Sequence, residues 1–311
     1  MEELTNFLTS IGEEVEDAEE ECFLLFAQEI PSANLGFVDS RATSVDVTIH
    51  GQDYTIHQSP TLLSSSRAGG TTGAVLWKIT PLFAEWITNK SNPLWSHTLL
   101  SPTSTVVELG CGISGLIALS LSPSITHYIA TDQEYVHRLL RQNLESNIIT
   151  TSRSRPKPSG KRHTYKSAAA AVPRSNITFT SLDWETDVPA SLKDSIEGGV
   201  VGEEDKGFDV LVSCDCIYND TLIAPLVRTC ADVCRLRPVY RPGRELGVGE
   251  RNPTVCVIAQ QQRSPEVFEA WLREALRVFR VWRVGDEVLG GGLGSGSGYL
   301  VHLLVLRDGE L

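Results

Sequence analysis

The stretch from Glu108 to Gly115, Glu-Leu-Gly-Cys-Gly-Ile-Ser-Gly, has the spacing that most clearly suggests ligand chemistry. Apolar and β-branched residues at 105–107 lead into it, and an apolar helical pattern at 116–119 follows at once. Glycines at the first, third and sixth positions of such a strand-to-helix turn let the backbone approach a ligand, with helix N–H groups directed at it. Three glycines also recur in plain turns, so the motif gains its meaning from its neighbours.

Two acidic residues accompany this turn. Asp132 lies 22 residues after Gly110, at the end of the next expected strand. A carboxylate there can accept hydrogen bonds from ribose hydroxyls, or it can cap the following helix. The glycine turn and Asp132 together predict an adenosine-bearing ligand, namely NAD, FAD or S-adenosylmethionine. Glu108 favours the last of these, because a carboxylate suits an ammonium and a sulfonium better than a pyrophosphate.

Two more expected strand ends carry polar residues. Asp183 and Trp184 close the third strand, where an indole can flank an adenine ring and a carboxylate can accept from its exocyclic amine. Asp215 follows the fourth strand and Tyr218 comes three residues later. The carboxyl ends of strands form the ligand crevice of an open α/β sheet, so these residues are expected beside the cofactor. The alternatives are a core position for Trp184 and a helix cap for Asp215.

The cysteines and the charge restrict the function classes. Seven cysteines without framework spacing indicate reduced thiols in the cytosol or nucleus. Cys230 and Cys234 can share a helix face but lack a partner pair, so we expect core thiols and no metal site. The net charge of −12 disfavours broad nucleic-acid binding and suits a basic protein partner. The start Met-Glu-Glu lacks the basic region of a signal peptide, and no apolar run reaches the length of a membrane helix.

From residue 105 the pattern alternates between strands and helices. The expected strands are 105–109, 127–131, 177–181, 208–213, 254–259, 278–284 and 299–306, and the expected helices are 116–121, 134–146, 222–236 and 265–278. This alternation predicts an α/β, Rossmann-like fold with a seven-stranded, mostly parallel sheet. Only a glycine tract, 290–298, joins the last two strands, so they are expected to be antiparallel neighbours.

The chain divides into three parts. Residues 1–21 hold nine acidic side chains and no Lys or Arg, which predicts an acidic mobile tail. Residues 22–100 are expected to form an N-terminal β-hairpin, over 44–49 and 54–57, and a helix over 73–89 that caps the main domain. Residues 101–311 form that main domain. A basic segment at 150–174 and an acidic segment at 193–206 interrupt the alternation of strands and helices, and both are expected to be exposed insertions. Nucleic-acid contact is expected, if at all, only through 150–174.

These motifs resemble a known family. The glycine turn, Asp132, the Leu-Asp-Trp at 182–184 and the Asp-Cys-Ile-Tyr at 215–218 resemble the class I, seven-β-strand protein-lysine methyltransferases known as methyltransferase family 16. Its signature is Asp/Glu-x-x-Tyr/Phe after the fourth strand, and the Gly-Ala-Val-Leu-Trp at 73–77 matches its Trp-containing segment. The resemblance covers about residues 44 to 306. Within the family, the chain is most similar to the fungal ribosomal lysine N-methyltransferase 5 group.

The resemblance implies a protein-lysine N-methyltransferase with S-adenosylmethionine as cofactor. It implies a lysine of a large-subunit ribosomal protein as substrate. We also expect a monomer, and the reduced thiols favour a cytoplasmic location that can extend to the nucleus. The residues that it places around the cofactor are Trp77, Gly110, Cys111, Gly112, Asp132, Trp184 and Cys214. The residues that it places toward the incoming lysine are Asp215 and Tyr218.

Three other readings of the residues stay open. A NAD-dependent oxidoreductase shares the glycine turn, and a non-catalytic interaction module can share the fold. A methyltransferase acting on another protein, a small molecule or a nucleic acid is the nearest alternative. Nucleic-acid amine methyltransferases often carry Asn/Asp-Pro-Pro-Tyr/Phe at this strand end, and the segment at 215–218 lacks the prolines.

Overall fold

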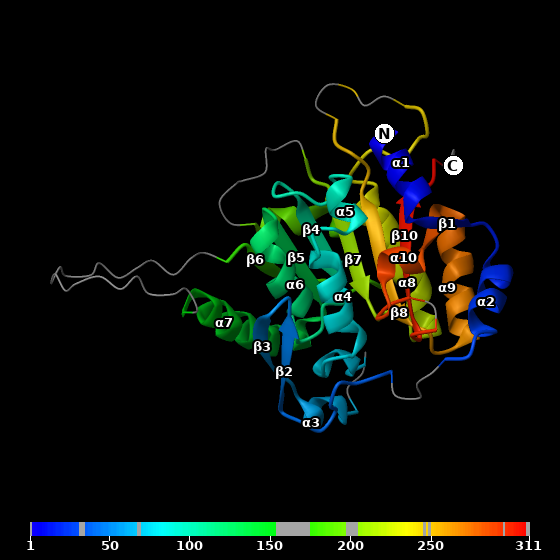
Figure 1. Cartoon of the computed structure of the whole chain (residues 1–311). Helices are drawn as coiled ribbons and strands as arrows, with labels where there is room; N and C mark the ends of the chain where they lie inside the picture. Colours follow the sequence, from blue (N-terminus) through cyan, green and yellow to red (C-terminus); the bar gives the residue numbers. More distant parts are fainter. Residues whose placement is uncertain are drawn as a thin grey trace.

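The computed structural model describes residues 2–30, 35–66, 70–153, 175–196, 205–244, 247, 250–294 and 296–308. Its main feature is a sheet of eight strands in the order β1-β9-β10-β8-β7-β4-β5-β6 (Figure 1). The strands are β1 (Gly12–Val15), β4 (Thr105–Leu109), β5 (His127–Asp132), β6 (Ile177–Ser181), β7 (Val210–Cys214), β8 (Val255–Gln261), β9 (Phe279–Val284) and β10 (Tyr299–Leu306). Strands β4 to β8 pair in parallel, whereas β10 runs antiparallel to both β8 and β9. The predicted α/β fold with a mostly parallel sheet is confirmed.

Helices cover both faces of this sheet. They are α1 (Glu2–Ile11), α2 (Ala18–Phe26), α3 (Pro60–Leu63), α4 (Ile79–Thr88), α5 (Pro93–Ser96), α6 (Leu116–Leu121), α7 (His137–Arg153), α8 (Asp220–Cys234), α9 (Pro265–Val278) and α10 (Asp286–Leu289). Short 3₁₀ segments are η1 (Thr72–Ala74), η2 (Ser122–Ser124), η3 (Glu134–Val136) and η4 (Pro189–Ser195). No described helix is long and apolar enough to cross a membrane.

The central strands are apolar on both faces because each face packs against helices. Val106 and Val212 face the core cluster that includes α4 and α6, whereas Val107 and Leu211 face the cluster that includes α8 and α9. All four of these side chains are fully buried. Such burial explains the continuous apolar runs of these strands, which are typical of parallel sheets.

A separate hairpin of β2 (Ser44–Ile49) and β3 (Gln52–His57) lies beside α7 (Figure 1). Two buried asparagines of α7 hold it in place. Asn143 accepts a hydrogen bond from the His57 N–H at 2.8 Å, and Asn147 accepts one from the Thr55 N–H at 3.0 Å. The helix expected over 73–89 begins only at Ile79, with Pro81 in its first turn, where a proline costs no helical hydrogen bond. The segment before Ile79 is therefore free to line the neighbouring pocket.

The predicted acidic mobile tail over 1–21 is wrong for the described residues of that segment. They form α1, β1 and the start of α2, and β1 adds an eighth strand by pairing with β9. Leu4, Phe7, Leu8 and Ile11 are buried at helical spacing, which the high acidic content had obscured. Three of the acids, Glu13, Glu14 and Glu21, pair with arginines of β9, and the Glu14–Arg280 distance is 2.6 Å.

Replacing Phe7 with Ala tests this packing. Phe7 is fully buried, so the substitution is expected to lower the free energy of unfolding by about 3–5 kcal/mol, measured by urea denaturation. Phe23 on α2 is 72% exposed and provides the matched control. Phe23→Ala should change the free energy of unfolding by less than about 0.5 kcal/mol. Equal effects of the two substitutions would contradict a packed N-terminal helix.

The two expected insertions fall partly outside the described residues. Residues 150–153 continue α7, and 154–174 are not described. Residues 197–204 are not described either, but the ends of that segment are not exposed as expected. Lys193 is buried at the end of η4, and its ammonium lies 3.5 Å from the Asp205 carboxylate. Arg237 contacts the same carboxylate at 2.8 Å, so two basic side chains share the Asp205 carboxylate.

The connection between the last two strands differs in detail from the expected loop. The strands β9 and β10 are antiparallel neighbours, as predicted. The short helix α10 precedes the glycine tract, whose described residues form turns. No regular element of more than one turn separates the strands within the described residues, in keeping with a hairpin connection.

Candidate active site

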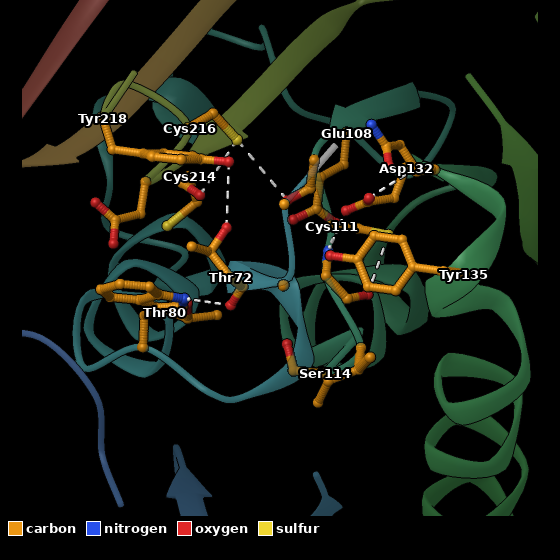
Figure 2. A pocket seen from close by; sticks show the side chains of 18 of the residues that line it. Thr72, Thr80, Glu108, Cys111, Ser114, Asp132, Tyr135, Cys214, Cys216 and Tyr218 are labelled. Atoms are coloured by element: carbon orange, nitrogen blue, oxygen red, sulfur yellow. Dashed lines mark hydrogen bonds between the residues drawn. The ribbon is translucent and has the colours of Figure 1, made fainter. Parts of the chain in front are cut away.

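A pocket lies at the carboxyl ends of β4, β5 and β7, and its labelled lining residues appear in Figure 2. It contains all the residues that the sequence predicted for a site. These are Trp77, Glu108, Gly110, Cys111, Gly112, Asp132, Asp183, Trp184, Cys214, Asp215 and Tyr218. Segments far apart in the chain therefore meet at one edge of the sheet, as expected for an open α/β sheet.

The glycine turn after β4 needs its glycines. Gly110 has a φ of 74° and Gly112 one of 59°, both in the left-handed region that favours glycine. A Cβ atom on Gly110 would lie 2.4 Å from the Cys216 sulfur and 3.2 Å from the Trp184 ring. The missing side chain lets the Cys216 thiol and the Trp184 ring pack directly against the turn. The turn from Gly110 to Gly112 forms a backbone cradle along one wall of the pocket.

Asp132 is fixed by the same turn. Its carboxylate accepts the Gly112 N–H at 2.8 Å and the Gln133 N–H at 2.7 Å. Burial raises its pKa to about 6, and these two hydrogen bonds oppose the rise. The following helical segment, η3, has no side-chain cap, so the helix-cap alternative for Asp132 is wrong. The remaining acceptor positions suit hydroxyl donors such as those of a ribose.

Glu108 is more deeply buried than the sequence suggested. Its carboxyl group accepts the Tyr128 hydroxyl at 2.8 Å. Burial raises the pKa of Glu108 to about 8, the hydrogen bond from Tyr128 lowers it, and the nearby Asp132 raises it further. Glu108 is therefore mostly protonated at neutral pH until a cation enters the pocket. A ligand ammonium would favour the ionised form, so ligand binding and proton release are coupled here.

Replacing Glu108 with Gln tests this protonation state. The pKa in the folded protein, about 8, is above the ordinary value of 4.5, so the unfolded chain releases the proton first as pH rises. The contribution of protonated Glu108 to the free energy of unfolding is complete below about pH 4.5. It falls by about 1.4 kcal/mol per pH unit as the pH rises toward about 8. Glu108→Gln should therefore raise the Tm of the ligand-free protein by an amount that grows between about pH 5 and pH 8. A Tm difference independent of pH in scanning fluorimetry would contradict this account.

Asp183 and Trp184 follow β6 and line the same pocket. The Trp184 indole N–H is buried and has no hydrogen-bond partner among the described residues. A buried donor without a partner is costly, and a ligand acceptor would remove the cost. Asp183 accepts the Glu185 N–H at 2.9 Å, which fixes its carboxylate at the pocket wall. The expectation that Trp184 reaches the pocket is confirmed, although its ring also packs against the core.

Asp215 has an unusual backbone conformation. Its φ is 62°, which is uncommon for a residue other than glycine, and its N–H donates to the Ala259 carbonyl at 2.7 Å. The N-cap of α8 is Asn219, so the cap alternative for Asp215 is wrong. The Arg263 guanidinium donates to both carboxylate oxygens of Asp215, at 2.7 and 2.6 Å. Residues in strained conformations are concentrated at functional sites.

Tyr218 closes the pocket on the side of Asp215. Its hydroxyl accepts a hydrogen bond from the Thr72 hydroxyl at 3.2 Å, and Figure 2 shows the two groups pointing toward one another. Burial raises the pKa of Tyr218, so the phenol stays neutral near pH 7. The residue is 37% exposed, so part of the ring faces solvent.

The three cysteines in the pocket are protonated thiols. Burial raises the pKa values of Cys111, Cys214 and Cys216, and neighbouring carboxylates add to the effect. Residues two apart in a strand point to the same face, but the strand ends at Cys214 and the chain turns at Asp215. Cys214 and Cys216 therefore belong to core clusters on different faces of the sheet, and both line the pocket. Protonated, buried thiols are poor nucleophiles and poor metal ligands. They act here as apolar wall.

The sequence analysis missed several lining or supporting residues. Thr72 binds Tyr218, and Tyr135 lines the pocket shortly after Asp132. Arg263 lies two residues beyond β8, which is the parallel neighbour of β7. Parallel strands end at a common crevice, and β8 is one of them. The same rule could therefore have predicted that a residue shortly after β8, such as Arg263, lies near the pocket. Nothing in the sequence indicated which of the polar residues after β8 would reach Asp215.

The chemistry of the lining residues selects among the adenosine-bearing ligands. The described residues that line the pocket include no Lys, Arg or His. Five of them are acidic, namely Glu108, Asp132, Asp183, Glu185 and Asp215. Carboxyl groups disfavour a pyrophosphate, and Glu108, which is protonated in the ligand-free protein, can ionise toward a bound cation. The cradle at Gly110 exposes backbone to the pocket, and the unpartnered indole N–H of Trp184 provides a donor for an aromatic base. The residues therefore fit S-adenosylmethionine.

Comparisons with known proteins agree with the site. A profile described as lysine methyltransferase matches residues 56–156. The ribosomal lysine N-methyltransferase 5 of Zygosaccharomyces rouxii is 31% identical over 245 residues, with 72% of this chain and 70% of that protein covered. The protein of the same name from Candida glabrata is 27% identical, with 73% and 70% covered.

A Schizosaccharomyces pombe protein named diaminohydroxyphosphoribosylamino-pyrimidine deaminase is 29% identical over 272 residues. The match covers 86% of this chain and 53% of that protein, so the chain spans about half of that relative's length.

The sheet order and the acidic pocket over the glycine turn define a class I methyltransferase with S-adenosylmethionine as its cofactor. Relatives of this similarity and coverage give the particular family. The chain belongs to the lysine methyltransferase family, methyltransferase family 16, together with the ribosomal lysine N-methyltransferase 5 proteins.

Proposed function

We propose that this chain transfers a methyl group from S-adenosylmethionine to a lysine of a large-subunit ribosomal protein. The observation that carries the proposal is the pocket, where Asp215 and Tyr218 adjoin the cradle at Gly110. The names of the relatives from Z. rouxii and C. glabrata support a ribosomal substrate. A monomeric enzyme in the cytoplasm, with access to the nucleus, is part of the same proposal.

Several residues would hold the cofactor. Asp132 would accept the ribose hydroxyls, and Trp184 would flank the adenine with Asp183 near its exocyclic amine. Glu108 would ionise toward the ligand ammonium, and Trp77 would form the wall opposite the glycine turn. When bound, S-adenosylmethionine supplies a methyl group activated by the positive charge of its sulfur.

The protein's own part in the transfer is to position the amine and to manage its proton. A lysine has an ordinary pKa of about 10.4, so it arrives as an ammonium and must lose a proton first. Asp215 would accept a hydrogen bond from that nitrogen, and Tyr218 would limit its rotation. The nitrogen lone pair would then be free to take the methyl group, and the sulfur of S-adenosylmethionine would keep the electron pair of the bond that breaks. The proton lost by the ammonium passes to water.

Separated ribosomal subunits provide the test. The protein is incubated with tritiated S-adenosylmethionine and either large or small subunits from cells lacking the enzyme. We expect label in one or a few large-subunit proteins and little in small subunits or RNA. Label confined to RNA, or to small molecules that pass a filter, would instead support one of the alternative methyltransferase classes.

A further inference from the structure

Arg263 holds Asp215 more tightly than any other described residue does. The Arg263 side chain is 23% exposed and the Asp215 side chain 3% exposed, and two parallel N–H···O bonds join them. Such bidentate pairs are among the strongest side-chain interactions. The Gln261 N–H donates to Oδ1 of the same carboxylate at 3.2 Å. Oδ2 accepts only one bond within the described part of the chain, so it has one acceptor position left.

Arg263 also contacts the wall of the pocket. Its guanidinium carbon lies 4.6 Å from the centre of the Trp77 ring, a cation–π contact. The Trp77 indole N–H donates to the Thr72 carbonyl at 3.0 Å. The centres of the Trp77 and Phe37 rings lie 4.3 Å apart. Trp77 and Asp215 line the pocket, whereas Arg263 does not. The guanidinium therefore supports both residues from outside the cleft.

Four other titratable side chains lie near Asp215, and none of them carries a charge near pH 7. The thiols of Cys214 and Cys216 on either side have raised pKa values. Burial raises the pKa of Tyr299 on β10 to about 12, and burial also raises the pKa of Tyr218. All four are neutral near pH 7. An incoming lysine thus meets an Asp–Arg pair with no net charge instead of a free carboxylate.

We propose that Arg263 is a positioning residue that cancels the charge of Asp215, so that the acceptor lysine is held by a hydrogen bond and is free to react as a neutral amine. This inference rests on the proposed lysine methylation. A free carboxylate beside the lysine would attract the ammonium more strongly but would raise its pKa by about 1–3 units. The enzyme would then hold more of the unreactive form. Arg263 therefore weakens the attraction for the lysine ammonium but increases the fraction of lysine present as the reactive neutral amine.

The first test compares methylation by wild type, Arg263→Gln and Arg263→Lys over a range of pH, with large ribosomal subunits as substrate. For Arg263→Gln, the midpoint of the kcat–pH profile should move upward by about one pH unit or more. S-adenosylmethionine affinity by calorimetry should fall by at most about fivefold, from the lost contact with Trp77. Arg263→Lys keeps the charge and should keep the wild-type midpoint with a lower plateau. A purely structural role would lower kcat at every pH without moving the midpoint.

The second test needs neither turnover nor cofactor. n-Butylammonium chloride reproduces the end of a lysine side chain, and sodium chloride at equal ionic strength is the control. We expect n-butylammonium to raise the Tm of Arg263→Gln, with little effect on wild type. The effect should vanish in the double variant Arg263→Gln/Asp215→Asn, which restores a neutral pair. Equal Tm shifts in wild type and Arg263→Gln would overturn the inference.

The two proposals fail in different ways. If the wild type methylates lysine but Arg263→Gln keeps the wild-type midpoint, only the role of Arg263 is wrong. If the wild type methylates no lysine, the proposed function is wrong and the role of Arg263 falls with it.

Discussion

Asp215→Asn is expected to lower kcat/KM for the ribosomal substrate by about 100-fold or more, because the acceptor nitrogen loses its orienting group. S-adenosylmethionine affinity should change by less than about threefold. Asparagine is a good choice because it tolerates the left-handed backbone conformation, here a φ of 62°. The change leaves the Arg263 guanidinium without a counter-ion, and this cation would repel a lysine ammonium. Both effects act on the substrate and spare the cofactor.

The control for Asp215→Asn is a second Asp–Arg pair. Asp308 accepts one hydrogen bond from Arg241 at 2.8 Å and forms an ion pair with its Nε at 2.7 Å, and Asp308 is no part of the pocket lining. Asp308→Asn should leave kcat/KM within about twofold, since exposed ion pairs contribute little. Steady-state methylation and calorimetry give both readouts. Normal turnover in Asp215→Asn would refute the role of Asp215, and lost cofactor binding would place Asp215 in the cofactor site instead.

Gly110→Ala is expected to reduce S-adenosylmethionine binding by about 100-fold or more. The added methyl group would meet the Cys216 sulfur at 2.4 Å, so the turn or the strand end after β7 must shift. Either shift moves the cradle that faces the adenosine. The left-handed φ of 74° adds strain of about 1 kcal/mol. Fluorescence or calorimetric titration with the cofactor measures the loss.

Gly243 provides the matched control for backbone strain. Its φ is 75°, nearly the same as that of Gly110, but a Cβ there would meet nothing within 4 Å. Gly243→Ala should therefore lower stability by about 1 kcal/mol and leave cofactor affinity unchanged. If both variants bind the cofactor normally, the cradle at Gly110 has no role in binding.

The sequence predicted the pocket well because its residues follow a simple rule. Residues at the carboxyl ends of parallel strands meet at one edge, so Gly110, Asp132, Trp184 and Asp215 could be grouped before any coordinates were known. Apolar runs located the strands that carry them. The pattern did not reveal β1, because a four-residue strand with two glutamates carries little periodic signal.

The details that were missed depend on three-dimensional contacts. Nothing in the sequence distinguishes Arg263 from other arginines as the partner of Asp215, since the pairing needs the register of β8 against β7. Burial likewise decides that Glu108 is protonated in the ligand-free protein, whereas its position in the motif suggested a carboxylate. The packed α1 was obscured by the acidic composition around it, although Phe7 and Ile11 have helical spacing. Composition describes a segment on average, but packing depends on where each residue lies.

The most direct measurement uses S-adenosylmethionine with a deuterated methyl group. The protein is incubated with large ribosomal subunits, and tandem mass spectrometry then locates the label in the ribosomal proteins. The account predicts a deuterated methyl group on the side-chain nitrogen of a lysine with wild type, and none with Asp215→Asn. Label on another residue type or on RNA, or equal labelling by the two proteins, would contradict it.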